Sequence, residues 1–181
     1  AVVLAATHPL CNGSSDGVVN IGVTGGTSPY TYLWSDGSVS NPATGLLAGA
    51  INVTVTDNVM CTTTIGTTLN NPPAITLTST PTNASCNGSS DGMVDLTVAG
   101  GTSAYSYLWN NSVINQDLTN VPVGIYMVTV TDANGCFSNH TANISEASSI
   151  SLVLNCTNVS VPNGSDGSSI ASVTGGTPGY T

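Results

Sequence analysis

Five cysteines are the side chains of this 181-residue sequence with the clearest chemistry. Four of them form two pairs with the same spacing in the sequence. Cys11 and Cys61 are separated by as many residues as Cys86 and Cys136. The sequence contains no Cys-x-x-Cys pair, which argues against a zinc site. In a secreted protein, the natural product of such paired cysteines is a disulfide.

The simplest prediction is a bond within each pair, Cys11–Cys61 and Cys86–Cys136. Each of these bonds requires that both cysteines lie at the same end of their domain. A staple between neighbouring domains, such as Cys11–Cys136, is an alternative, and free buried thiols are another, because spacing alone does not determine connectivity. Cys156 has no partner at the common spacing.

Several carboxylates recur at matching positions, each in or just before a turn: Asp16, Asp91 and Asp166 in one set, and Asp57 and Asp132 in the other. One interpretation is that these side chains cap their turns by accepting hydrogen bonds from backbone N–H groups. The alternative is a calcium site at a domain end, for which Asp16, Asp57, Asp91 and Asp132 are the candidates. No EF-hand string occurs, so calcium is the weaker prediction and no other cofactor is expected.

No set of residues in the sequence points to catalysis. His8 and His140 are not repeated, so neither belongs to a site shared by the two halves. No Gly-x-Ser-x-Gly motif marks a nucleophile, and no pair of acids has a spacing that selects it for glycoside hydrolysis. We therefore expect that the protein is not an enzyme.

The charge composition excludes several kinds of partner. The sequence has no Lys or Arg and a formal net charge of -9. Such a chain cannot neutralise phosphates, which excludes nucleic acid as a partner and binding to anionic lipid through a basic patch. The apolar runs are much shorter than the roughly 18 residues of a membrane span, so no membrane insertion is expected.

The sequence is a tandem repeat. Cys-Asn-Gly-Ser-Ser-Asp-Gly occurs at 11–17 and 86–92, Gly-Gly-Thr-Ser at 25–28 and 100–103, and Val-Thr-Val-Thr-Asp at 53–57 and 128–132, always at the same offset. Two residues at this offset, such as Cys11 and Cys86, are called equivalent. We predict repeats over 1–73 and 74–148, with short linkers at 70–73 and 145–148, and the start of a third repeat over 149–181. The third piece is too short to close its own core, so we expect that further chain or another molecule completes it.

Each repeat has the pattern of a β-sandwich. Residues 51–56 alternate apolar and polar, which indicates a half-buried strand. Further strands are predicted at 18–24, 30–34, 62–69 and 75–80, with turn residues between them. About seven short strands with frequent turns predict an all-β chain of tandem immunoglobulin-like antiparallel sandwiches in a linear array. Trp34 and Trp109 are expected at equivalent buried positions, and Tyr126 is placed like a tyrosine corner.

Taken together, these strings resemble the SprB repeat, over both full copies and the start of the third. That family occurs in tandem in very large surface adhesins of gliding bacteria, which a type IX system exports. The Gly-Gly-Thr-x-x-Tyr-x-Tyr-Leu-Trp portion is also similar to PKD domains, which are immunoglobulin-like. The resemblance implies an extracellular, cell-surface array of modules without catalytic residues.

Glycosylation is predicted from the scarcity of charge. Sheet edges are usually protected by charged residues or Pro, and this chain has few charges, so covalent sugar or burial of the edges in a fibre of copies must replace them. Ten of its Asn residues lie in Asn-x-Ser/Thr sequons. The better candidates are Asn52, Asn110, Asn139 and Asn143, whereas Asn12 and Asn87 lie in Asn-Gly turns. O-linked sugar on Ser or Thr is the competing form.

The leading functional hypothesis is a structural and adhesive module of an extracellular bacterial stalk or filament. The alternative is a carbohydrate- or ligand-binding module, with a surface polysaccharide held by the loops around 25–29 and 58–60. A glycan array would separate the two hypotheses.

Overall fold

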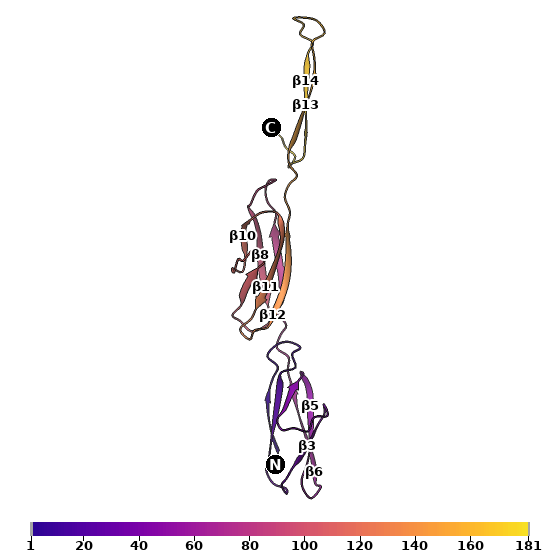
Figure 1. The fold of residues 1–181 in the computed structure, drawn as a ribbon, viewed down its shortest axis with the longest axis vertical. Helices are drawn as coiled ribbons and strands as arrows, with labels where there is room; N and C mark the ends of the chain where they lie inside the picture. The colour runs from indigo at the N-terminus through magenta and orange to yellow at the C-terminus, as the bar shows by residue number, and fades with distance from the viewer. Residues whose placement is uncertain (1, 181) are drawn as a thin grey trace. The chain divides into compact units, whose positions relative to one another are not determined.

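The computed structural model describes residues 2–180 and contains fourteen strands, β1 to β14. Among these residues there is no helix, and therefore none with the length and apolarity that crossing a membrane requires. The ribbon is all-β and antiparallel, apart from one isolated parallel bridge between Ala84 and Glu146 (Figure 1). The predicted all-β, antiparallel fold class is confirmed, and the linear array stays a prediction.

The chain divides into two compact units. Unit 1 contains Ala1–Leu77, Val98–Ser106 and Val130–Ser138, and unit 2 contains Thr78–Thr97, Tyr107–Thr129 and Asn139–Thr181. The loops at the junction of the first two repeats therefore all belong to unit 1. The repeat boundaries after residues 73 and 148 stay predictions.

The first repeat is a sandwich of two three-stranded sheets, with orders β1-β2-β4 and β3-β5-β6. The strands are β1 (Val2–Thr7), β2 (Gly17–Val23), β3 (Thr31–Trp34), β4 (Ala43–Leu46), β5 (Gly49–Thr56) and β6 (Thr62–Leu69). Strand β5 follows the predicted alternation, with Ile51, Val53 and Val55 buried. These side chains form one core with residues from the other sheet: Val19, Ile21, Ala43 and Leu46.

The second repeat has the same six strands. They are β7 (Thr76–Thr82), β8 (Gly92–Ala99), β9 (Ser106–Trp109), β10 (Leu118–Val121), β11 (Gly124–Thr131) and β12 (Phe137–Ile144). Its sheets have orders β10-β8-β7 and β12-β11-β9, which repeat the order of the first sandwich. Each expected sandwich therefore forms, with six strands in place of about seven.

Every buried residue in the core of the first repeat has a buried equivalent in the second. Trp34 is 2% exposed and Trp109 is 1% exposed, and each indole donates to a backbone carbonyl six residues later. The prediction of equivalent buried tryptophans is confirmed. Tyr126 is also buried, and its hydroxyl donates to the Pro122 carbonyl at 2.8 Å, as a tyrosine corner requires.

Gly17 and Gly92 occupy the tightest place in each core. A Cβ added at Gly17 would lie 2.7 Å from the Leu46 carbonyl oxygen and 2.8 Å from Leu69 Cδ1. At Gly92 the same atom would lie 2.7 Å from Ile144 Cγ2 and 2.8 Å from the Val121 carbonyl oxygen. Glycine is required here because there is no space for a side chain.

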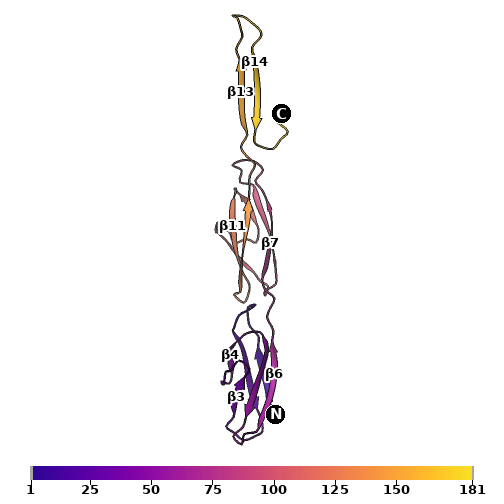
Figure 2. The same ribbon diagram turned by 90° about the vertical axis from the view of Figure 1, so that its right-hand side faces the viewer.

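The third copy forms a hairpin of β13 (Ser151–Thr157) and β14 (Ser168–Thr174). Figures 1 and 2, seen from perpendicular directions, both show these strands side by side. Within the described residues they make a two-stranded sheet of their own. Leu152 pairs with Val173 and Leu154 with Ala171, in the register of β1 with β2.

Candidate functional site

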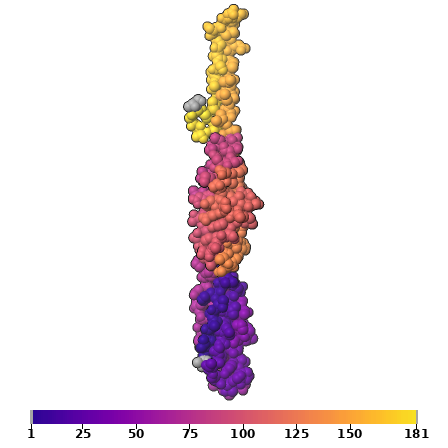
Figure 3. Space-filling view, turned by 90° about the vertical axis from the view of Figure 1, so that its left-hand side faces the viewer, coloured from indigo at the N-terminus to yellow at the C-terminus, as the bar shows by residue number. Residues whose placement is uncertain are grey.

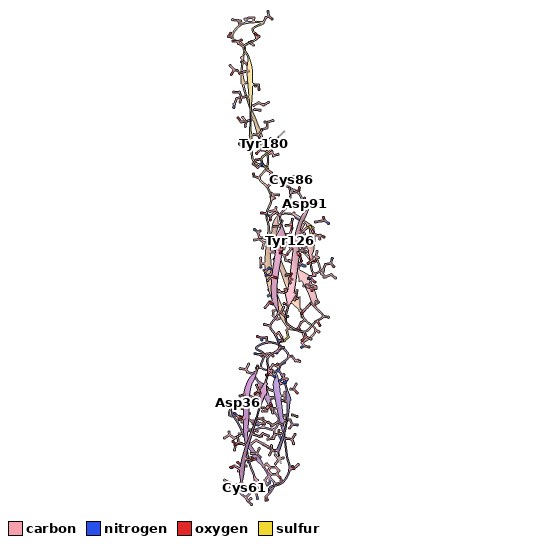
Figure 4. The ribbon with its side chains drawn as sticks, turned by 180° about the vertical axis from the view of Figure 1, so that it is seen from behind. Asp36, Cys61, Cys86, Asp91, Tyr126 and Tyr180 are labelled. Carbon is pink, nitrogen blue, oxygen red and sulfur yellow. A yellow bond between two sulfur atoms is a disulfide. The ribbon has the colours of Figure 1, made fainter. Side chains whose placement is uncertain are left out.

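The one disulfide among the described residues joins Cys11 to Cys136. Cys11 lies in the loop between β1 and β2, Cys136 follows the turn after β11, and both belong to unit 1. The bond is the interdomain staple that the sequence left as an alternative. The preferred pairings Cys11–Cys61 and Cys86–Cys136 are wrong, because Cys61 and Cys86 are free and exposed, as is Cys156 (Figure 4 labels Cys61 and Cys86).

The strand topology explains the correction. Cys11 precedes Gly17, which packs against Leu69 at the end of β6. Cys61 lies at the start of β6, on the turn at the other end of that eight-residue strand. Eight residues of extended chain span about 26 Å. A disulfide needs Cα atoms within about 7 Å of each other, so the two cysteines of one repeat cannot meet.

Side-chain amides fix the cysteine loop to the linker between the repeats. The Asn12 amide Nδ2 donates to the Pro72 carbonyl at 2.9 Å, and the Gly13 N–H donates to Asn71 Oδ1 at 3.1 Å. From the other side, Asn134 Nδ2 donates to Thr102 Oγ1 at 3.1 Å and more weakly to the Leu10 carbonyl at 3.4 Å. The staple therefore lies within a network of hydrogen bonds.

Asp132 shapes the turn that carries Cys136. Its Oδ1 accepts from the N–H groups of Asn134 and Cys136, both at 2.9 Å, and its Oδ2 accepts from the Thr102 N–H at 2.9 Å. The carboxylate is 7% exposed. The hydrogen bonds, the one from Thr102 first, hold the pKa of Asp132 below its ordinary value. The carboxylate thereby connects the turn to the Gly-Gly-Thr loop.

Asp57 repeats this arrangement in the first repeat. It accepts from the N–H groups of Thr27 at 3.0 Å, Val59 at 3.0 Å and Cys61 at 2.9 Å. The pKa of Asp57 is lowered, with the bond from Thr27 as the first cause. In each Asp-x-x-x-Cys turn the carboxylate therefore holds the backbone of the turn through hydrogen bonds and fixes the position of one cysteine.

The second set of aspartates caps the cysteine loops. Asp16 accepts from Ser14 Oγ and the Leu10 N–H, Asp91 from the Ser85 N–H, and Asp166 from the Ser160 N–H. These hydrogen bonds lower the pKa of all three carboxyl groups, through Ser14, Ser85 and Ser160 respectively. The turn-capping interpretation is confirmed. Over residues 2–180 no three His, Cys, Asp or Glu side chains gather as a metal site would require.

His8 has a structural role that its lack of repetition concealed. Its Nδ1 accepts from the Asn70 N–H at 3.1 Å, and in the second repeat Asn83 Oδ1 accepts from the Ser145 N–H at 2.9 Å. His8 and Asn83 are equivalent positions of the two repeats, as are Asn70 and Ser145. Two different side chains therefore supply one acceptor.

The six asparagines predicted as glycosylation candidates fall into two groups. Asn52, Asn139 and Asn143 are exposed on outward strand faces. The other three have their Nδ2 groups engaged: Asn12 donates to Pro72, Asn87 to Glu146 Oε1 at 2.8 Å, and Asn110 to the Ile125 carbonyl at 3.1 Å. Asn110 also accepts from the Met127 N–H, so its amide faces the backbone of β11.

The residues that sequence reasoning missed are those of the linker. Asn71 and Glu146 stand at equivalent positions, and each accepts from the glycine N–H of a Cys-Asn-Gly loop, that of Gly13 and that of Gly88. The sequence feature that could have identified them is a side chain with an acceptor oxygen at the same position of both linkers, although the two residue types differ. Identity between the repeats could not reveal it.

The comparison with protein families agrees with the repeat structure. The SprB repeat family matches the chain twice, over residues 4–39 and 78–113, so the resemblance seen in the sequence is confirmed. No curated protein matches. Among solved structures, the amphioxus IgVJ-C2 molecule is similar at 15% sequence identity and a TM-score of 0.31, covering 74% of this chain and 98% of that chain.

Proposed function

Because two segments of the chain match the SprB repeat, we propose that it is a structural and adhesive part of an extracellular bacterial stalk or filament. The observation that carries the proposal is the staple between repeats. A disulfide from Cys11 to Cys136 ties the first cysteine loop to a turn of the second repeat. Such bonds persist in oxidising surroundings outside the cell.

The surface chemistry supports the same function. With no Lys or Arg and only nine acidic residues, the surface carries few charges, and exposed Thr, Ser and Asn share it with exposed apolar side chains such as Leu33, Met127 and Phe137. On the face of β5 and β6, Thr54 and Thr64 stand opposite each other with their hydroxyl oxygens 3.1 Å apart. Rows of exposed hydroxyl groups suit a module whose function depends on its length and on its surface chemistry rather than on a binding cleft.

Surface location is tested by labelling intact source cells with an antibody against the chain. The expected result is labelling without permeabilisation, and a truncated gene should reduce attachment of the cells to surfaces. Labelling that requires permeabilised cells would contradict the proposal.

Covalent sugar on the outward faces is part of the proposal. Asn52, Asn139 and Asn143 are its N-linked sites, because their side chains are exposed on strand faces, whereas the amide of Asn110, although exposed, donates to the Ile125 carbonyl and accepts from the Met127 N–H. Peptides of native material that contain these asparagines should be heavier than the masses calculated for their bare sequences. Glycopeptide mapping then separates N-linkage at these three sites from O-linkage on the Thr rows. Masses equal to those of the bare peptides would remove glycosylation.

A carbohydrate-binding module is the rival function. A hollow of about 490 Å³ in unit 1 is lined by Gly25, Tyr30, Asp57 and Cys61, in the loops where a glycan was expected. Binding of the purified chain on a glycan array, abolished by Tyr30→Ala but not by Tyr32→Ala, would favour the rival.

A further inference from the structure

The surroundings of Cys86 repeat those of the staple. Beside Cys11–Cys136 lies a hollow of about 300 Å³, and beside the free thiol of Cys86 lies one of about 450 Å³. Most residues that line the second hollow are equivalent to residues that line the first: Ser85, Cys86, Asn87, Ala147, Ser148, Ser149 and Ile150. All of them belong to unit 2.

The backbone contacts at the two places are also the same. The Gly101 N–H donates to the Pro73 carbonyl at 3.0 Å, and the Gly176 N–H donates to the Ser148 carbonyl at 2.8 Å. A Cβ at Gly101 would lie 2.7 Å from Ile75 Cγ1, and one at Gly176 would lie 2.6 Å from Ile150 Cγ1. The hairpin β13–β14 therefore meets its linker as β7–β8 meets its own.

What Cys86 lacks is a turn of the Asp-x-x-x-Cys kind. The sequence contains two such turns, Asp57–Cys61 and Asp132–Cys136. Each carboxylate already accepts from the threonine N–H of its own Gly-Gly-Thr loop, that of Thr27 and that of Thr102. Thr177 occupies the same place in the third loop. The missing turn must come with a sheet that packs on the hairpin.

The hairpin carries an uncovered apolar face for such a sheet. Leu152 is 60% exposed and Leu154 is 59% exposed, whereas Val2 and Leu4 at the same positions of β1 pack against the core of unit 1. Leu154 pairs with Ala171, and the equivalent residues of the second repeat are Ser79 and Leu96. The large side chain therefore lies on the first strand of the hairpin in the third copy and on the second strand in the second repeat. The volume presented to a covering sheet is thereby kept. Figure 3 shows β13 and β14 with no other strand over the face drawn.

We infer that Cys86 forms a second staple, to the cysteine of an Asp-x-x-x-Cys turn on a three-stranded sheet like β9-β11-β12 that covers β13–β14. Cys61 is the equivalent of Cys136 in the first repeat, so it would be the turn cysteine in another bond of this kind. The Cys86 thiolate attacks a small disulfide such as oxidised glutathione and releases one glutathione thiol. The thiolate of the turn cysteine then attacks the Cys86 sulfur of the mixed disulfide and releases the second glutathione thiol. The protons of the two protein thiols end on the two glutathione thiols.

The experiment supplies the missing sheet from the chain's own sequence. A copy of residues 107–148 is joined after Thr181, because Thr181 is the equivalent of Ser106 in the third repeat. Within this copy Phe137→Tyr gives its cysteine peptide a mass of its own. The protein is folded in a glutathione redox buffer and mapped without reduction, using pepsin because the 181 residues contain no Lys or Arg for trypsin.

The expected result is a peptide linking Cys86 to the cysteine of the added turn, beside the native Cys11–Cys136 link, with alkylation of Cys86 lost. Hydrogen exchange of residues 151–157 and 168–174 should slow. In the matched control, Cys→Ser in the added turn should keep the slowed exchange and restore alkylation of Cys86. Linkage of Cys86 to Cys61 or Cys156, a free Cys86, or a hairpin that exchanges as in the parent chain would each overturn the inference.

Discussion

Asp132 and Asp57 each bind three backbone N–H groups, and this arrangement links stability to pH. Their pKa values are lowered in the folded protein by these bonds, first of all by those from Thr102 and Thr27. A group with a lowered pKa stabilises the fold above its unfolded pKa, which is about 4 for Asp. The contribution is lost as the pH falls through the folded value.

We therefore expect the free energy of unfolding to be constant above about pH 5 and to fall below about pH 4. Urea denaturation across this range measures it. Asp132→Asn should flatten the acid limb and lower stability at neutral pH, because its amide nitrogen cannot accept from the Thr102 N–H. Asp95→Asn, on the exposed face of β8, is the control and should change neither. Equal acid limbs in all three proteins would refute the role of Asp132.

A strand depends on the space around its residues as much as on its sequence pattern. Strand β2 contains one glycine in a crowded position and one in an open position. Gly17 and Gly22 lie on this one strand. A Cβ at Gly17 would lie 2.7 Å from a backbone oxygen, whereas the nearest atom to a Cβ at Gly22 is 4.0 Å away. Neither position has a positive φ, so the difference between them is one of packing.

Gly17→Ala should therefore lower the free energy of unfolding by about 1–3 kcal/mol, the usual cost of overpacking a core. Gly22→Ala should leave it unchanged or raise it slightly, because alanine reduces the entropy of the unfolded chain. Thermal denaturation followed by circular dichroism compares the two variants. A Gly17→Ala protein as stable as the Gly22→Ala protein would show that the core can yield at this point.

Most strands of the first repeat were predicted from the sequence, and β1 and β4 were not. Residues 51–56 alternate and became most of β5, and 62–69 became β6. Strand β1 was missed because its residues are almost all apolar, so period two does not appear in them. Strand β4 was missed because it has four residues, Gly45 among them.

The candidate site was predictable in its residues but not in its pairing. Spacing identified four cysteines, two of which form the bond. Which end of a strand a cysteine occupies follows from the connection of the strands, and that information is not local in the sequence. His8 and Asn83 were hidden for a related reason, since one backbone N–H can be satisfied by either acceptor.

At the scale of the whole molecule, the staple closes a long stretch of chain. By the chain-entropy model, a closed loop of 100 residues or more stabilises the folded state by about 4–5 kcal/mol, and measured values are often about 2–4 kcal/mol. The double variant Cys11→Ser/Cys136→Ser should lose stability in this range, measured by guanidinium denaturation. Cys61→Ser removes an exposed free thiol and is the matched control. A double variant with the midpoint of Cys61→Ser would contradict the expectation.

The same bond decides which residues feel a pulling force. If the chain is pulled at its two ends, tension passes from Cys11 through the sulfur atoms to Cys136, and the 125 residues of sequence separation between them stay relaxed. At about 3.5 Å per residue, this hidden contour length is about 440 Å. In single-molecule stretching, the oxidised chain should extend by that much less than the reduced chain. A surface fibre built in this way would therefore resist lengthening under drag through covalent bonds, even if its sandwiches are mechanically weak.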